Sequence, residues 1–343
     1  MRTHRIATVG LVCLTVALST GAGPLLAQPP GQGPTDGVAV DSLTKERLAE
    51  NAVKRTIDTC ALLDPESVKE VFDAPPRDVT LREFDSCSMT VEPTPGTTSR
   101  SWSISVSTSV TVSKRDNAET MELHGRTFAR RADRVGGIPD QSCAWAVLGD
   151  ATTLPVQLSV SWRGRNDEPP PKPQCEVAKA YLMKLVPYWL TPSKRGEGAT
   201  KPELVLPTKD PCAAIPELAK RFAKPGVQPK MKSISPYMCA LEVTPFNMQT
   251  RTLPEEIQIS FRWADNPAHQ AKQPITVAGK PGSVAPERMI DKSCQVDVQY
   301  DPTMVPERFA SDPNGRDVQV ITVTAKTCDV AQPAAELVVK GAL

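Results

Sequence analysis

The chain has 343 residues, with 40 Lys and Arg against 39 Asp and Glu, and a formal net charge of +1 at pH 7. This balance leaves no excess of basic residues for counterion-driven binding, so nucleic acids are excluded as primary partners. Proline is frequent, at 34 residues, yet 40% of the residues are hydrophobic, which is too many for a disordered chain. The composition therefore predicts a folded, loop-rich protein that is long enough for two domains.

Residues 1–27 have the pattern of a secretory signal peptide, with a basic start, an apolar stretch and a cleavage site after Ala27, where Leu25 is larger than the small residue usually preferred at that position. The apolar stretch is short for a bilayer span of roughly 20 residues, which favours cleavage over a retained anchor. Cys13 lies inside this stretch, too near the start for lipoprotein processing. We expect an exported chain that contacts a membrane only if the signal peptide is retained, with a disordered leader over residues 28–54.

The other eight cysteines form two sets of four with nearly equal intervals. The sequence around them also agrees, as in Asp58-Thr59-Cys60-Ala61 and Asp210-Pro211-Cys212-Ala213. Such self-similarity indicates a duplication. The predicted organisation is a first repeat domain at 55–190, a linker at 191–206 and a second repeat domain at 207–343.

An even number of cysteines in an exported chain predicts structural disulfides. Confining the bonds to each repeat, and requiring the same pattern in both, leaves three patterns. No Cys-x-x-Cys motif is present to suggest a redox role. Of the three patterns we favour bonds between neighbours in sequence, which are Cys60–Cys87, Cys143–Cys175, Cys212–Cys239 and Cys294–Cys328.

Hydrophobic periodicity and turn residues predict the elements of the first repeat. In chain order these are a short helix opened by Asp64-Pro65-Glu66, strands at Val79–Phe84, Cys87–Val91 and Trp102–Val112, a helix at Ala118–Arg134, a hairpin of Cys143–Leu148 with Leu154–Trp162, and a helix at Cys175–Leu185.

The second repeat predicts a similar order with one difference. The stretch Asn266–Gly282, which matches the middle helix, contains three prolines, so we expect that helix to be shortened or lost. The other elements predicted for the second repeat are helices at Pro216–Phe222 and Cys328–Val339, and strands at Ile257–Trp263, Cys294–Tyr300 and Val318–Val323. Both repeats together predict an α+β fold of two tandem homologous domains, each an antiparallel sheet with packed helices and two disulfides.

Each repeat opens on a short motif, Asp58-Thr59-Cys60 or Asp210-Pro211-Cys212, and closes on Cys175-Glu176-Val177-Ala178 or Cys328-Asp329-Val330-Ala331. With these motifs each repeat resembles a secreted or lipoprotein-type domain of unknown function that is common in actinobacteria. The resemblance implies an envelope-associated, non-catalytic module and supplies no active site. The chain lacks the lipid-attachment cysteine that members of this group often carry, which puts membrane tethering in doubt.

Motifs for catalysis and cofactor binding are missing from the sequence. After the leader only two histidines remain, His124 and His269, and they occupy non-equivalent positions. The chain has no nucleophile elbow, phosphate-binding loop or dinucleotide fingerprint. We therefore predict no catalytic residues, no metal ligands and no cofactor.

Three features suggest binding. Arg126, Arg130 and Arg134 would form a basic stripe on the predicted middle helix, either a solvated face or a docking site for an anionic partner. The segment Glu168-Pro169-Pro170-Pro171-Lys172-Pro173 would be a stiff tether or a ligand for an aromatic groove. The aromatic residues are predicted mainly in the core, with Tyr188 and Trp189 placed to cover a contact between the domains; the set is Trp102, Trp145, Trp162, Tyr181, Tyr188 and Trp189.

These observations favour a secreted, non-catalytic binding protein of the cell envelope or the extracellular space. The expected partner is an envelope protein or polymer, whose identity the sequence does not give. Two alternatives remain open at this point. One is an extracytoplasmic sensor or accessory subunit, and the other is a hydrolase that uses paired carboxylates.

Overall fold

The structure is a computed structural model of the full chain. The chain divides after Pro34, and every feature below belongs to the compact unit Thr35–Leu343. The residues that the structure describes are 37–94, 96, 100–109, 117–131, 142–148, 154–164, 168–197, 200, 203–245, 249, 254–269, 273–286, 293–302 and 317–342.

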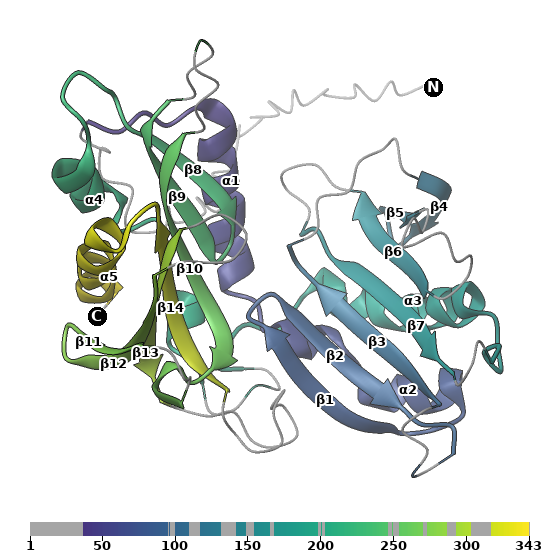
Figure 1. Cartoon of the computed structure of the whole chain (residues 1–343). Coiled ribbons are helices and arrows are strands. Elements are labelled where there is room, and N and C mark those ends of the chain that lie inside the picture. The colour runs from purple at the N-terminus through teal and green to yellow at the C-terminus, as the bar shows by residue number, and fades with distance from the viewer. Residues whose placement is uncertain are drawn as a thin grey trace, which may run out of the picture. The chain divides into compact units, whose positions relative to one another are not determined.

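The first sheet has seven antiparallel strands in the order β1-β2-β3-β7-β6-β5-β4 (Figure 1). The strands β2, β3 and β7 alternate buried apolar residues with small polar ones, as predicted for strands with one face on a core. Their bounds are β1 Pro76–Glu83, β2 Ser86–Val91, β3 Ser101–Ser107, β4 Asn117–Leu123, β5 Arg126–Arg131, β6 Ser142–Leu148 and β7 Gln157–Arg163.

Helices α2 (Pro65–Phe72) and α3 (Gln174–Leu190) pack together, and α3 lies on β6 and β7. The helix α2 begins where the sequence predicts, because the Asp64 side chain accepts hydrogen bonds from the backbone N–H groups of Glu66 and Ser67. A short 3-10 helix, η1 (Thr59–Leu62), precedes α2.

The second sheet has seven antiparallel strands in the order β11-β12-β13-β14-β10-β9-β8. Read from β8, this order is the order of the first sheet read from β1. Helices α4 (Ile215–Phe222) and α5 (Cys328–Ala342) pack on it, with the 3-10 helices η3 (Leu206–Thr208) and η4 (Pro267–His269) nearby. The strands are β8 Lys230–Ser235, β9 Met238–Thr244, β10 Glu255–Asp265, β11 Gln273–Val277, β12 Lys280–Ala285, β13 Cys294–Asp301 and β14 Asp317–Ala325.

The four disulfides join neighbours in sequence, as the favoured pattern predicts. They are Cys60–Cys87, Cys143–Cys175, Cys212–Cys239 and Cys294–Cys328. In each sheet one bond fixes the second strand to the segment before the first helix, and the other fixes a central strand to the last helix. The fold is thus α+β, with two antiparallel sheets, packed helices and four disulfides.

The predicted helix at Ala118–Arg134 is wrong, because this segment forms the β4–β5 hairpin. His124 and Gly125 both have positive φ, 50° and 73°, as the central residues of a two-residue hairpin turn of type I′ do. The second sheet has the equivalent hairpin, β11–β12, with Ala278 and Gly279 at φ 48° and 81°. The segment with three prolines is therefore an equivalent hairpin instead of a shortened helix.

Two segments outside the sheets also differ from the prediction. Residues 42–54 of the predicted disordered leader, together with Arg55, form helix α1 (Ser42–Arg55), whose N-cap Asp41 accepts a hydrogen bond from Thr44. This helix packs along β8 (Figure 1). Asn51 donates to the Ser233 hydroxyl at 3.0 Å. The predicted linker also packs against the rest of the unit, because its residues Thr200, Leu204 and Leu206 are buried.

Candidate binding surface

The first sheet has two faces of opposite character. One face carries Met89, Trp102, Ile104 and other buried apolar side chains, and Phe72 and Tyr181 of the helices complete this core. Because side chains alternate along a strand, the residues between these apolar positions lie on the opposite face. On β2, β3 and β7 they all carry hydroxyl groups, apart from residues at the border. We call this the serine face, and it consists of Ser86, Ser88, Thr90, Ser101, Ser103, Ser105, Ser107, Ser159 and Ser161.

The strand register aligns these hydroxyl residues in rows across the sheet. Within a row the neighbours are separated by the strand spacing of about 4.8 Å, and successive rows by about 6.8 Å along the strands. The rows are Ser86–Ser107, Ser88–Ser105–Ser159 and Thr90–Ser103–Ser161. The serine face is therefore a two-dimensional array of short, uncharged side chains.

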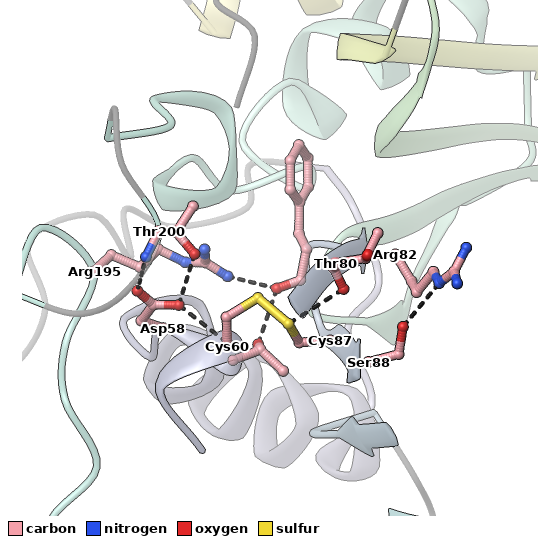
Figure 2. Close-up of a disulfide and its surroundings, with 10 residues drawn as sticks. Asp58, Cys60, Thr80, Arg82, Cys87, Ser88, Arg195 and Thr200 are labelled. Carbon is pink, nitrogen blue, oxygen red and sulfur yellow. Dashed lines mark hydrogen bonds between the residues drawn. A yellow bond between two sulfur atoms is a disulfide. The ribbon is translucent and has the colours of Figure 1, made fainter. Parts of the chain in front are cut away.

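Most of these hydroxyl groups have no side-chain partner. Ser88 accepts a hydrogen bond from Arg82 Nε at 2.9 Å, as Figure 2 shows, and Ser107 accepts one from the Ser109 N–H at 3.3 Å. Within the described part of the chain, the hydroxyls of Ser105 and Ser159 have no hydrogen-bond partner. Both residues are half-buried, so their hydroxyls can bond to solvent or to a ligand.

Charged side chains lie at the borders of the serine face and beside Ser88, to which Arg82 of β1 donates. Arg163 is exposed at the end of β7 and pairs with Ser101, while Glu83 of β1 pairs with Ser86. Burial raises the pKa of the Glu83 carboxyl, and the charge of Arg262, 4.0 Å away, opposes this rise. The array itself has no formal charge.

The β1–β2 hairpin, which carries one edge of the serine face, is attached at several points, and Figure 2 shows the disulfide among them. The Cys60–Cys87 disulfide joins β2 to η1. Arg195 donates to the Phe84 carbonyl oxygen at 2.6 Å and to the Tyr237 hydroxyl at 2.8 Å. These bonds fix the hairpin that carries one edge of the array.

Asp58 holds η1 at the other end of this disulfide. Its carboxylate accepts hydrogen bonds from the N–H of Cys60 at 3.1 Å, from the N–H of Thr200 at 2.9 Å and from the Thr200 hydroxyl at 2.9 Å (Figure 2). The side chain is buried, and all three donors belong to segments beside the disulfide. These bonds have a structural role, because they position the segments that the disulfide joins.

The corresponding face of the second sheet is different. Aligning the two sheets on Cys87 and Cys239 places Gln258 where Ser105 is, and aligning them on Cys143 and Cys294 places Thr324 where Ser159 is. Gln258 and Thr324 pair with each other, as Ser105 and Ser159 do.

Its polar groups also bond to one another. Asp297 accepts hydrogen bonds from Gln295 and from the Thr322 hydroxyl, each at 2.8 Å. Lys232 forms ion pairs with Glu242 and Glu256. The ion pairs and the hydrogen-bonded Asp297 carboxylate therefore distinguish the second sheet from the first, while hydroxyls without partners, such as Ser283 of β12, occur on it as well.

The arginine stripe was predicted on a helix, but the segment that carries Arg126 and Arg130 is the strand β5. Arg126 and Arg130 lie on one face of β5, on either side of the buried Phe128, and this face contacts α3. Arg126 donates to the Trp189 carbonyl oxygen at 3.2 Å, and Arg130 lies 3.6 Å from the Cys175 sulfur. Arg134 lies outside the described residues. The two described arginines hold α3 on the sheet, so they form no stripe directed away from the protein.

The other predicted features have mainly structural positions. Lys172, in the proline-rich segment, donates to the Val71 carbonyl oxygen at 3.0 Å, which ties the segment to α2. Of the aromatic set, Trp162 is half-buried and Tyr188 is 51% exposed, while the other four are buried. Trp189 donates to the Leu62 carbonyl oxygen at 2.9 Å within the first half. His124 occupies the β4–β5 turn.

Among the described residues, no group of three or more His, Cys, Asp or Glu side chains could hold a metal ion. The helices in that same part of the chain include none with the length and apolar character needed to cross a membrane.

The sequence contained the signal for the serine face, since serines and threonines alternate with Ile104 and Val106 in the predicted strand. Alternation alone predicts a strand and not a site, because the rows appear only when the partner strands and their register are known.

Comparisons of the chain with protein-family models, with curated proteins and with solved structures found no match.

Proposed function

We propose that the protein is an exported, non-catalytic binding protein of the cell envelope or the extracellular space, built from two copies of one module. Four disulfides support export, because such bonds persist in oxidising compartments. The two modules would belong to the actinobacterial type that the cysteine motifs resemble.

The duplication is supported by the agreement between the two sheets. Both have the same strand order, including the return from the third strand to the seventh, and both have a two-residue hairpin turn ending in glycine between the fourth and fifth strands. Disulfides join the corresponding elements. An arrangement with this many matching details is difficult to explain without a common origin.

The serine face is the observation that carries the binding function. The two sheets share one strand order and one disulfide pattern, while the first presents rows of uncharged hydroxyls and the second presents ion pairs and a hydrogen-bonded carboxylate. A flat sheet face can contact an extended partner over several strands, whereas it gives no enclosed space for a reaction. We therefore assign recognition, and not catalysis, to this face.

Cosedimentation tests this function. The purified, oxidised mature chain is mixed with cell envelopes of its native host and centrifuged, and the bound fraction is measured over a range of protein concentrations. Saturable binding that denatured and reduced protein does not show is the expected result. If the chain stays in the supernatant at every concentration, with envelopes and with the insoluble material of the growth medium, the proposed function is wrong.

A further inference from the structure

We propose that the serine face binds an uncharged polysaccharide through hydrogen bonds to its rows of hydroxyl groups. This inference rests on the proposed binding function and names the class of ligand.

The charge of the face matches a neutral polymer. The nine positions of the serine face carry no ionisable group; the charged residues Glu83 and Arg163 lie at its borders, and Arg82 of β1 reaches the face at Ser88 alone among the nine. A polyanion needs a concentration of Lys and Arg, which the face does not provide. An uncharged surface and an uncharged chain can approach without either of them losing the solvation of a charge.

The hydrogen-bonding capacity of the face also matches. A serine or threonine hydroxyl has one donor and two acceptor positions, as a sugar hydroxyl has, so each can bond to the other in either direction. Among the residues that the structure describes, the hydroxyls of Ser103, Ser105, Ser159 and Ser161 are free to do so.

The array of hydroxyls extends to a fourth strand, because Thr80 of β1 belongs to the row of Ser88. Within the described part of the chain, neither Thr80 nor Ser101, at the other end of the face, makes a side-chain hydrogen bond. The hydroxyl residues thus continue across β1, β2, β3 and β7.

The face does not fit a protein or a lipid surface. Protein interfaces are rich in aromatic residues and Arg and poor in Ser, and their strongest contacts come from large side chains in pockets. A membrane surface would require exposed apolar or basic side chains. The serine face has neither, since the apolar residues of β2 and β3 lie on the opposite side in the core.

Repeated rows suit a repeating ligand. A single row offers a few hydrogen bonds in competition with water, so a short oligosaccharide should bind weakly. A chain that contacts several rows gains from linked binding events, so affinity should rise at least tenfold from a disaccharide to a polymer.

Affinity electrophoresis of the full mature chain tests the proposal. Native gels contain dextran, galactomannan or a soluble β-1,3-glucan as neutral probes, and polygalacturonate as an anionic probe. We expect at least one neutral polymer to retard the protein, with little change when salt is added to 0.5 M. Retardation by the anionic probe alone, or by no probe, would overturn the proposal.

The duplication supplies a matched control. Ser105→Glu introduces a charge in the middle row and should weaken retardation at least tenfold, while Gln258→Glu, at the corresponding position of the second sheet, should leave it unchanged. The double variant Ser105→Ala/Ser159→Ala removes two hydroxyls without adding charge or bulk, and it should weaken binding even if Ser105→Glu fails to fold. Equal retardation of the alanine variant and the unmodified chain would exclude the serine face.

The cosedimentation assay separates this proposal from the more general one. If the chain binds envelopes but the serine-face variants bind equally well, the protein is a binding protein that uses another surface. If it binds neither envelopes nor neutral polymers, both proposals fail.

Discussion

Replacing Asp58 with alanine should destabilise the first half of the chain far more than the same change at Asp210, its counterpart in the second. Asp58 is 1% exposed, and its carboxylate accepts from two N–H groups and one hydroxyl. The alanine would leave the N–H of Cys60, and both the N–H and the hydroxyl of Thr200, without this acceptor. A buried donor without a partner costs about 1–3 kcal/mol, so the total loss should be about 3–5 kcal/mol.

The comparison with Asp210 makes this prediction specific. Its side chain is 39% exposed, accepts from the N–H of Cys212 and lies 3.5 Å from Arg55. Loss of such a cap costs about 0.5–2 kcal/mol. The excess cost at Asp58 should therefore come from Thr200, and Thr200→Val in a double-mutant cycle with Asp58→Ala should give a coupling energy of about 1 kcal/mol or more.

Equilibrium unfolding of the oxidised proteins in guanidinium chloride, followed by tryptophan fluorescence, measures these differences. If both alanine variants lose the same free energy within about 0.5 kcal/mol, the buried bonds to Thr200 do not carry the stability assigned to them. A coupling energy near zero between Asp58 and Thr200 would refute the reasoning in the same way.

Three other changes test separate parts of the structure. Replacing Cys60 and Cys87 with alanine opens a loop with a sequence separation of 27 and should lower the free energy of unfolding by about 3.5 kcal/mol, measured in denaturant. Burial raises the pKa of Glu83, so the folded protein holds this proton more tightly than the unfolded chain does, and the stability due to Glu83 falls as the pH rises above the ordinary value of 4.5. Melting temperatures measured from about pH 4 to about pH 7, a range that begins near the reference pKa of glutamate, should thus show Glu83→Gln gaining stability relative to the unmodified chain as the pH rises. A difference in melting temperature that stays constant across this range would contradict this. Trp189→Phe removes the donor to the Leu62 carbonyl oxygen and should cost about 1–3 kcal/mol in the same denaturant assay, whereas an unchanged midpoint would show that this bond adds nothing.

Local signals in the sequence predict much of the framework. The Asp64-Pro65-Glu66 cap predicts the start of α2, and the cysteine spacing predicts the disulfide neighbours. The helix predicted at Ala118–Arg134 is wrong because Met121, Phe128 and Ala132 fit a helical period as well as two short strands. The deciding residues are His124 and Gly125, whose positive φ values define the turn.

Features made by distant segments could not be predicted in this way. The N-terminal helix α1 buries the polar residues Thr44, Asn51 and Arg55, so it has no apolar stripe that would mark it as packed. Its place beside β8 depends on partners far along the chain, such as Ser233 and the Pro236 carbonyl oxygen. The serine face depends likewise on the register of β2, β3 and β7, which no single segment encodes.

The position of α1 also sets an order of events for a chain that emerges N-terminus first. Asn51 and its partner Ser233 are 182 residues apart in sequence, so α1 has no docking surface until β8 has emerged. The β1–β7 sheet can form in the meantime, because its strands come from the intervening chain. Docking of α1 is then a late, long-range step, slow to be reached because such contacts close a large loop.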